Sequence, residues 1–313
     1  MVSKKYYLLK LMKISLKMEK RIMSSMELIK KLRETTGSGM LDCKKALAEN
    51  NDDLDAAIKW LREKGILKAQ KKQDRETNEG VISFYNHETS FNSFSLCKIK
   101  CETDFVAKND DFLSFANQLT KAIHESDNIN PQGNFDDINS ISINGKKLDS
   151  ALTDLISKIG ENIQIISYKK YNSENSIFIN YLHNKYNSSC SKIASVVEIS
   201  TNDTKKASEI SDDLKVVAMQ VSAMKPMGLN EESLDTKVLD DEKDIILKQI
   251  ENTPEDKKEQ IVKGKLNKFI KENTLMGQAL ITDPKNTVSN YISNLSKTNN
   301  LELNISSMDL YTI

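Results

Sequence analysis

In residues 26–69, apolar side chains recur at helical spacing in three short runs. The clearest run follows the i, i+3, i+4, i+7 pattern of an amphipathic helix: Leu54, Ala57, Ile58 and Leu61. Gly37-Ser38-Gly39 separates the first run from a second over 40–49, because glycine permits the positive φ of a tight turn. We expect Gly65 to end the third helix at its C′ position. Three helices this short bury little area, so 26–69 is predicted to be a helical docking module, followed by a connector over 70–79.

From Gly80 onward, short apolar stretches typical of strands alternate with amphipathic runs typical of helices. Strands are predicted over 81–85, 94–100, 163–168, 176–182 and 193–199. Helices are predicted over 110–124, 148–159 and 209–224, and a variable loop over 126–147. The predicted fold class is therefore α+β with antiparallel sheets, in two strand-plus-helix halves, 80–162 and 163–313, that look like a diverged repeat.

Residues 235–272 form a different piece within the second half. Two amphipathic runs are separated by Thr253-Pro254, and two antiparallel helices joined by a short turn form a helical hairpin. Such a hairpin suits contact with a partner or self-association, or it packs on the core. A helix near 287–296 and a strand near 301–306 come after it.

The composition is that of a globular protein of 313 residues without net charge, since 45 Lys and Arg balance 45 Asp and Glu. Nucleic-acid binders usually carry a basic excess, so the balance argues against that class. No apolar run approaches the ~20 residues of a membrane span. The sequence therefore predicts no membrane segment.

Residues 1–25 are an exception to this balance, because seven Lys or Arg side chains accompany only Glu19. An acid-poor amphipathic start is typical of an organelle transit peptide. Arginine is scarce here, so we favour a basic leader ahead of a true start at Met23 or Met26. The favoured interpretation predicts a bacterial cytoplasmic protein, and the alternative a mitochondrial or plastid one.

The chain carries no recognisable catalytic motif: neither a phosphate-binding loop, a dinucleotide fingerprint, a zinc-protease helix nor a nucleophile elbow. Cys97 and Cys101 are four residues apart, which is a weak zinc signal without a second close pair of ligands. Reduced thiols explain the four cysteines more simply. We predict no enzyme activity, no metal and no cofactor.

The segment Thr103 to Asn109 joins the predicted strand pair to a helix, and Asn109 suits the N-cap of that helix. Phe105 lies in this polar turn and has two destinations. It packs into the protein's own core, or it is an exposed anchor that inserts into a partner. Spacing alone favours the core.

At these residues the sequence resembles the elongation factor Ts family. Thr103-Asp104-Phe105-Val106-Ala107-Lys108-Asn109 matches the family's second signature letter for letter, and residues 32–47 match its N-terminal signature. Further similar blocks are Lys158 to Ile163, Tyr181 to His183 and Asp283 to Val288.

The resemblance implies a small three-helix domain like ubiquitin-associated domains, a core of two similar halves and a hairpin inserted in the second. It implies a guanine nucleotide exchange factor that acts in translation elongation. The implied partner is elongation factor Tu, in its GDP-bound and its nucleotide-free form. The implied mechanism places Asp104 and Phe105 in the nucleotide-binding domain of the partner. There the ring wedges between two helices near the magnesium site and weakens the grip on magnesium and phosphate, so that GDP leaves. A higher-order complex of the two factors is compatible with this resemblance.

The implied contacts with elongation factor Tu involve three segments: Thr103, Asp104, Phe105, Val106 and Lys108 in the turn; Met40, Leu41 and Lys44 in the N-terminal signature; Ile193, Ala194 and Gln220, with the helix that ends at Met224, in the second half. Two departures from the family pattern fall here. Ala194 replaces a usual glycine, and Gln220 replaces a common histidine. The helical tail that many members carry after the last strand does not appear before Ile313.

Two other functions fit parts of the chain. A ubiquitin- or nascent-chain-binding adaptor would use 26–69, and a nucleic-acid-binding protein would use the basic stretch Lys68 to Arg75. The first does not explain Thr103 to Asn109, and the neutral composition disfavours the second.

Overall fold

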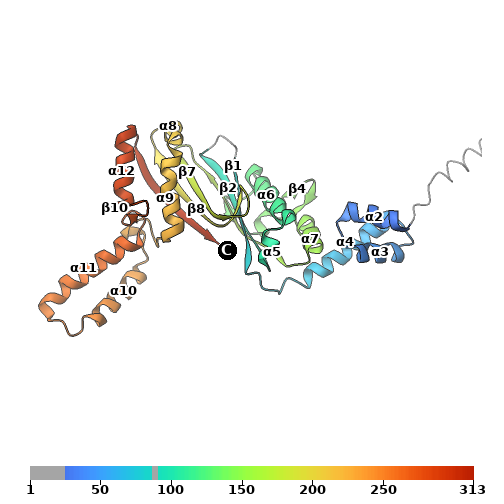
Figure 1. Ribbon diagram of the computed structural model, residues 1–313, viewed down its shortest axis with the longest axis horizontal. Helices are drawn as coiled ribbons and strands as arrows, with labels where there is room; N and C mark the ends of the chain where they lie inside the picture. The colour runs from blue at the N-terminus through green and yellow to red at the C-terminus, as the bar shows by residue number, and fades with distance from the viewer. Residues whose placement is uncertain (1–24, 87–90) are drawn as a thin grey trace, which may run out of the picture. The chain divides into compact units, whose positions relative to one another are not determined.

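The computed structural model describes residues 25–86 and 91–313 (Figure 1). These residues form two compact units. The first holds the described residues up to Asp74 together with Ser150–Asn162, and the second holds Arg75–Asp149 and Ile163–Ile313. The predicted leader, 1–25, lies outside the described residues except for Ser25.

The first unit contains the three predicted helices, α2 (Ser25–Thr36), α3 (Met40–Glu49) and α4 (Leu54–Gln70). The Asp53 side chain caps α4 by accepting a hydrogen bond from the Ala56 amide. The helices bury a shared core: Ile29, Leu32, Cys43, Ala46, Leu47, Ala57 and Leu61.

Gly65 does not end α4, which continues to Gln70, so the predicted C′ position is wrong. Gly65 is buried where most of α7 (Leu148–Ile159) joins the first unit. A Cβ added at Gly65 would lie 2.7 Å from the Ser157 Oγ of α7. This glycine therefore permits close helix packing instead of a positive φ.

The second unit is built on one seven-stranded sheet in which every pair of neighbouring strands is antiparallel. Its strands are β1 (Glu79–Asn86), β2 (Ser93–Cys101), β3 (Gln132–Gly133), β6 (Ile163–Asn172), β7 (Ser176–Lys185), β8 (Cys190–Thr201) and β11 (Leu303–Thr312). The strand order is β11-β8-β1-β2-β6-β3, with β7 also paired to β8. The α+β class is confirmed, and the two predicted sets of strands share one sheet through the β1–β8 pairing.

Both halves of this unit use the same order of elements. In the first half, β2 leads into the short helix α5 (Asp104–Ala107) and then α6 (Asp110–Glu125). In the second half, β8 leads into α8 (Thr204–Glu209) and then α9 (Ser211–Met224). The predicted single helix over 209–224 is therefore two helices, because Asp203 caps α8 separately by accepting from the Lys206 amide.

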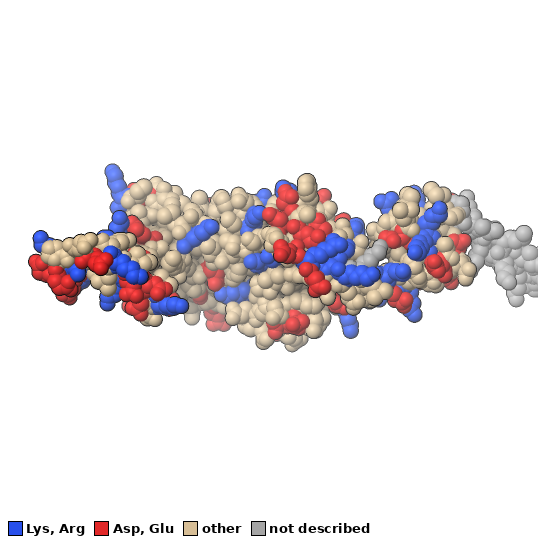
Figure 2. Space-filling view, turned by 90° about the horizontal axis from the view of Figure 1, so that it is seen from below, with Lys and Arg blue, Asp and Glu red and all other residues tan. Residues whose placement is uncertain are grey.

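The two halves differ in the segment after the long helix. Residues 126–147 of the first half hold only short elements: β3, a 3-10 turn at Asp136–Ile138, β4 (Ser142–Ile143) and β5 (Lys146–Lys147). At the matching place the second half holds the predicted hairpin of α10 (Thr236–Gln249) and α11 (Glu255–Asn273). Basic and acidic side chains are interspersed over this hairpin (Figure 2). A 3-10 turn (Glu231–Ser233), β9 (Ala279–Leu280), β10 (Asp283–Thr287) and α12 (Val288–Asn299) complete this half.

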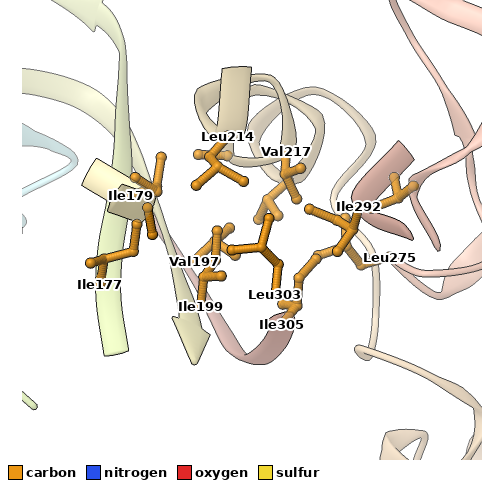
Figure 3. Close-up of a cluster of buried hydrophobic side chains, with 14 of the residues drawn as sticks. Ile177, Ile179, Val197, Ile199, Leu214, Val217, Leu275, Ile292, Leu303 and Ile305 are labelled. Atoms are coloured by element: carbon orange, nitrogen blue, oxygen red, sulfur yellow. The ribbon is translucent and has the colours of Figure 1, made fainter. Parts of the chain in front are cut away.

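Apolar clusters lie on both faces of the sheet. Residues of β7, β8 and β11 pack under α9 and α12, with Leu214, Val217 and Ile292 pointing towards the strands (Figure 3). On the opposite face of the strands, Phe84, Phe94 and Phe178 belong to a second cluster. Full burial of each such side chain stabilises the fold by ~1.5–3 kcal/mol.

Candidate partner-binding site

The turn after β2 holds Phe105 out of the core. The Thr103 Oγ1 accepts a hydrogen bond from the Val106 amide at 3.4 Å and so caps α5. Val106 and Ala107 are buried against the sheet. Successive helical residues are rotated by ~100°, so burial of these two turns Phe105 away, and the residue is 82% exposed. The expectation from spacing, that Phe105 packs in the core, is therefore wrong.

An ion pair accompanies the exposed ring. The Lys108 Nζ lies 2.8 Å from the Asp104 Oδ2, one helical turn away. This hydrogen bond from Lys108 holds the pKa of the Asp104 carboxyl below its usual range and raises the pKa of Lys108. Asn109 then caps α6, as predicted, by accepting from the amides of Asp111 and Phe112. The turn thus presents a phenyl ring beside an ionised carboxylate.

In the first unit, the N-terminal candidates occupy the outer face of α3. Cys43, Ala46 and Leu47 face the core of the unit, which leaves Met40 53% exposed and Leu41 83% exposed. Lys44 is also exposed. Two large apolar side chains thus stand in solvent beside a cation, which is typical of a protein-binding surface.

The second-half candidates lie mostly beneath the surface. Ile193 is half-buried, Ala194 is 1% exposed and Gln220 is completely buried. The Gln220 amide donates to Gln278 Oε1 and to the Ala279 carbonyl, and its oxygen accepts from the Ile281 amide at 2.9 Å. The resemblance implies that Ala194 and Gln220 contact the partner, but in this structure both side chains are buried and not available for direct contact.

Two exposed apolar side chains of this region were not expected from the sequence, Met227 and Ile281, whereas Met224 ends the helix that the resemblance implied. Met224, Met227 and Ile281 are 48%, 60% and 41% exposed. Met224 ends α9 one helical turn beyond Gln220, and Ile281 follows β9. Large apolar residues beside Pro226 and in a polar turn were the available signal.

The thiols of the four cysteines are enclosed within the fold. All four are buried, and burial raises the pKa of the Cys97 thiol and, to about 11, that of Cys190. Within 25–86 and 91–313, no three His, Cys, Asp or Glu side chains are grouped to hold a metal ion. In the same residues, no helix is long and apolar enough to span a bilayer.

Comparison with known proteins identifies the family. Residues 102–313 match the family model described as elongation factor TS, and residues 13–72 match the one described as elongation factor Ts, mitochondrial, N-terminal. The elongation factor Ts of Alkalilimnicola ehrlichii is 40% identical over 266 residues, which cover 84% of this chain and 85% of the relative. That of Clostridium botulinum is 36% identical over 277 residues, 88% and 87% of the two chains, and that of Caulobacter vibrioides 35% over 276 residues, 87% and 86%. The chain belongs to the elongation factor Ts family, whose role is in protein biosynthesis.

Proposed function

We propose that this chain is a guanine nucleotide exchange factor for elongation factor Tu and that Phe105 is the residue that drives GDP release. The exposure of Phe105, 82% on a capped helix with buried neighbours, carries this proposal. A phenyl ring left in water forgoes ~1.5–3 kcal/mol of burial, which insertion into a partner recovers. Aromatic side chains presented in this way are common binding hot spots.

The proposed mechanism is a competition for one protein. The ring enters the nucleotide-binding domain of elongation factor Tu near the magnesium site, and Asp104 brings its negative charge to the same place. Both disturb the hold on magnesium and phosphate. Because coupling is reciprocal, a factor that weakens GDP binding is itself weakened by GDP, so the exchange is reversible and GTP completes it. The chain supplies binding energy and no covalent chemistry.

Two further surfaces support the same complex. Met40, Leu41 and Lys44 on α3 are proposed as a second contact with the partner. Ile193 and the end of α9 are proposed as a third, with Ala194 and Gln220 as internal supports. The partner would be bound in its GDP-bound and nucleotide-free states, and a higher-order complex remains compatible with the fold.

Because the relatives named above are bacterial, a cytoplasmic location is proposed, with an organelle as the alternative if 1–25 are a transit peptide.

Stopped-flow release of a fluorescent GDP from elongation factor Tu tests the proposal. We expect the wild-type chain to accelerate release and Phe105→Ala to lose about 30-fold of that acceleration, the equivalent of a ~2 kcal/mol hot spot. Phe91→Ala is the matched control, because Phe91 is a second exposed phenylalanine, at 38%. No acceleration by wild type would refute the function, and full acceleration by Phe105→Ala would refute the role of the ring.

A further inference from the structure

The Glu79–Lys192 ion pair joins the two halves of the core beside the Phe105 turn. The Lys192 Nζ lies 3.0 and 2.9 Å from the two carboxylate oxygens of Glu79. Glu79 is the first residue of β1 and pairs with Cys101 of β2. Cys101 lies two residues before Thr103, so Glu79 is close to the start of the Phe105 turn. Lys192 lies on β8 in the second half, directly before Ile193. One ion pair thus lies between two of the proposed contact segments.

This pair is electrostatically connected to the pair within α5. The pKa of Lys108 is raised first by its hydrogen bond to Asp104, and the charge of Glu79 raises it further. The pKa of Lys192 is raised first by its hydrogen bond to Glu79, and the charge of Asp104 raises it further. Charges of alternating sign therefore run from the Phe105 turn across to the second half.

We propose that Glu79 and Lys192 are positioning residues for nucleotide exchange, which hold α5 and the second-half surface in the arrangement that engages one partner simultaneously. This inference rests on the proposed function. A helix of four residues has few contacts of its own, so its direction depends on the strands that carry it. Partly exposed ion pairs contribute little to global stability, and the side chains of Lys192 and Glu79 are 39% and 26% exposed. A contribution to global stability therefore explains poorly why Lys192 contacts both carboxylate oxygens of Glu79.

A second ion pair of similar kind provides the control. The Lys169 Nζ lies 2.7 Å from the Asp309 Oδ2, with side chains 32% and 31% exposed, and the pair links two other strands of the same sheet, β6 and β11. Lys169 pairs with Leu96 on β2, five residues before Cys101, so it is remote from α5 along the strand. Loss of this pair should loosen the contact between β6 and β11 without touching the Phe105 turn.

The experiment measures GDP release from elongation factor Tu against the concentration of full-length chain, for wild type, Lys192→Met, Lys192→Arg, Glu79→Gln and Lys169→Met. We expect Lys192→Met and Glu79→Gln to lower the maximal release rate about tenfold, since small displacements of a positioned group have large kinetic effects. The half-saturating concentration should change less than about threefold, because the exposed contact side chains remain in place. Lys192→Arg and Lys169→Met should keep the wild-type rate, and thermal unfolding should stay close to wild type in all four variants.

Three results would overturn the inference. They are a wild-type rate in both Lys192→Met and Glu79→Gln, an equal loss in Lys169→Met, and a loss that appears only as a lowered unfolding temperature. If wild type accelerates release and Phe105→Ala does not while Lys192→Met does, only the positioning role fails. If wild type itself gives no acceleration, the proposed function fails as well.

Discussion

At the scale of single residues, the Cys190 thiol lies in a polar cluster beneath α6. The Asn117 Oδ1 accepts hydrogen bonds from Ser83 Oγ, Ser189 Oγ and Cys190 Sγ, at 3.2, 2.9 and 3.2 Å. These contacts join α6 to β1 and to the start of β8. Burial raises the pKa of the Cys190 thiol from its ordinary value of 9.0 to about 11.

This shift makes stability sensitive to alkali. Between pH 9 and about 11 the unfolded thiol ionises while the folded one stays protonated, so the free energy of unfolding falls as pH rises through that window. We expect Cys190→Ser, which keeps a hydroxyl donor but does not ionise, to remove about 2–3 kcal/mol of that fall. Urea unfolding at pH 8 and pH 11 measures it. Equal pH dependence in both proteins would contradict the shift.

At the scale of elements, Gly65 and Ser157 set how closely α4 and α7 pack within the first unit. The Ser157 hydroxyl is buried and has no hydrogen-bond partner among the described residues. An alanine at Gly65 would favour the helix by up to ~1 kcal/mol but would meet that hydroxyl. The contact with Ser157, and not helix propensity, therefore decides whether Gly65→Ala raises or lowers the stability of the protein.

A double-mutant cycle separates these two effects. We expect Gly65→Ala to destabilise the protein by about 1 kcal/mol through overpacking. Ser157→Ala should be neutral or stabilising, because it removes an unsatisfied buried hydroxyl. The double variant should then be more stable than wild type. Additive effects in chemical unfolding would show that the two positions are independent and would contradict the packing role of Gly65.

At the scale of the whole molecule, the hairpin behaves as an insertion into a repeated core. Among the described residues, the core cluster under α9 takes no side chain from Thr236–Asn273. The chain leaves and re-enters the core at adjacent points, since the Met227 amide donates to the Asn273 carbonyl and the Leu275 amide donates to the Gly228 carbonyl. The core should therefore not require the hairpin in order to fold.

Replacement of residues 239–267 by a short Gly-Ser linker tests this independence. We expect a variant with less helix by circular dichroism, an unchanged sheet signal and an unfolding temperature within about 2–4 °C of wild type, the effect of ~1 kcal/mol on a domain of about 150–250 residues. As a control, Leu214→Ala, which opens a cavity in the core cluster, should lower stability by about 2–5 kcal/mol. Loss of cooperative unfolding in the deletion variant would show that the core depends on the hairpin.

The sequence by itself determined the elements that depend on local patterns. Helix α3 has its predicted ends, and both the strand pair β1–β2 and the hairpin form where apolar spacing, caps and Pro254 placed them. These features were readable because turn residues, caps and periodicity act between near neighbours in the chain. The family signature at Thr103 to Asn109 was likewise readable, and it indicated an exposed role for Phe105 that spacing did not.

Tertiary structure alone decided where the candidate side chains point and which groups surround them. Gly65 looks like a helix end until α7 is packed on it, and Gln220 looks like a surface amide until β9 covers it. The Glu79–Lys192 pair joins residues 113 positions apart. Such contacts depend on which distant strands pair and which helix faces them. Local composition does not encode that information, so direction, burial and ion pairing at the candidate site emerge only from the folded chain.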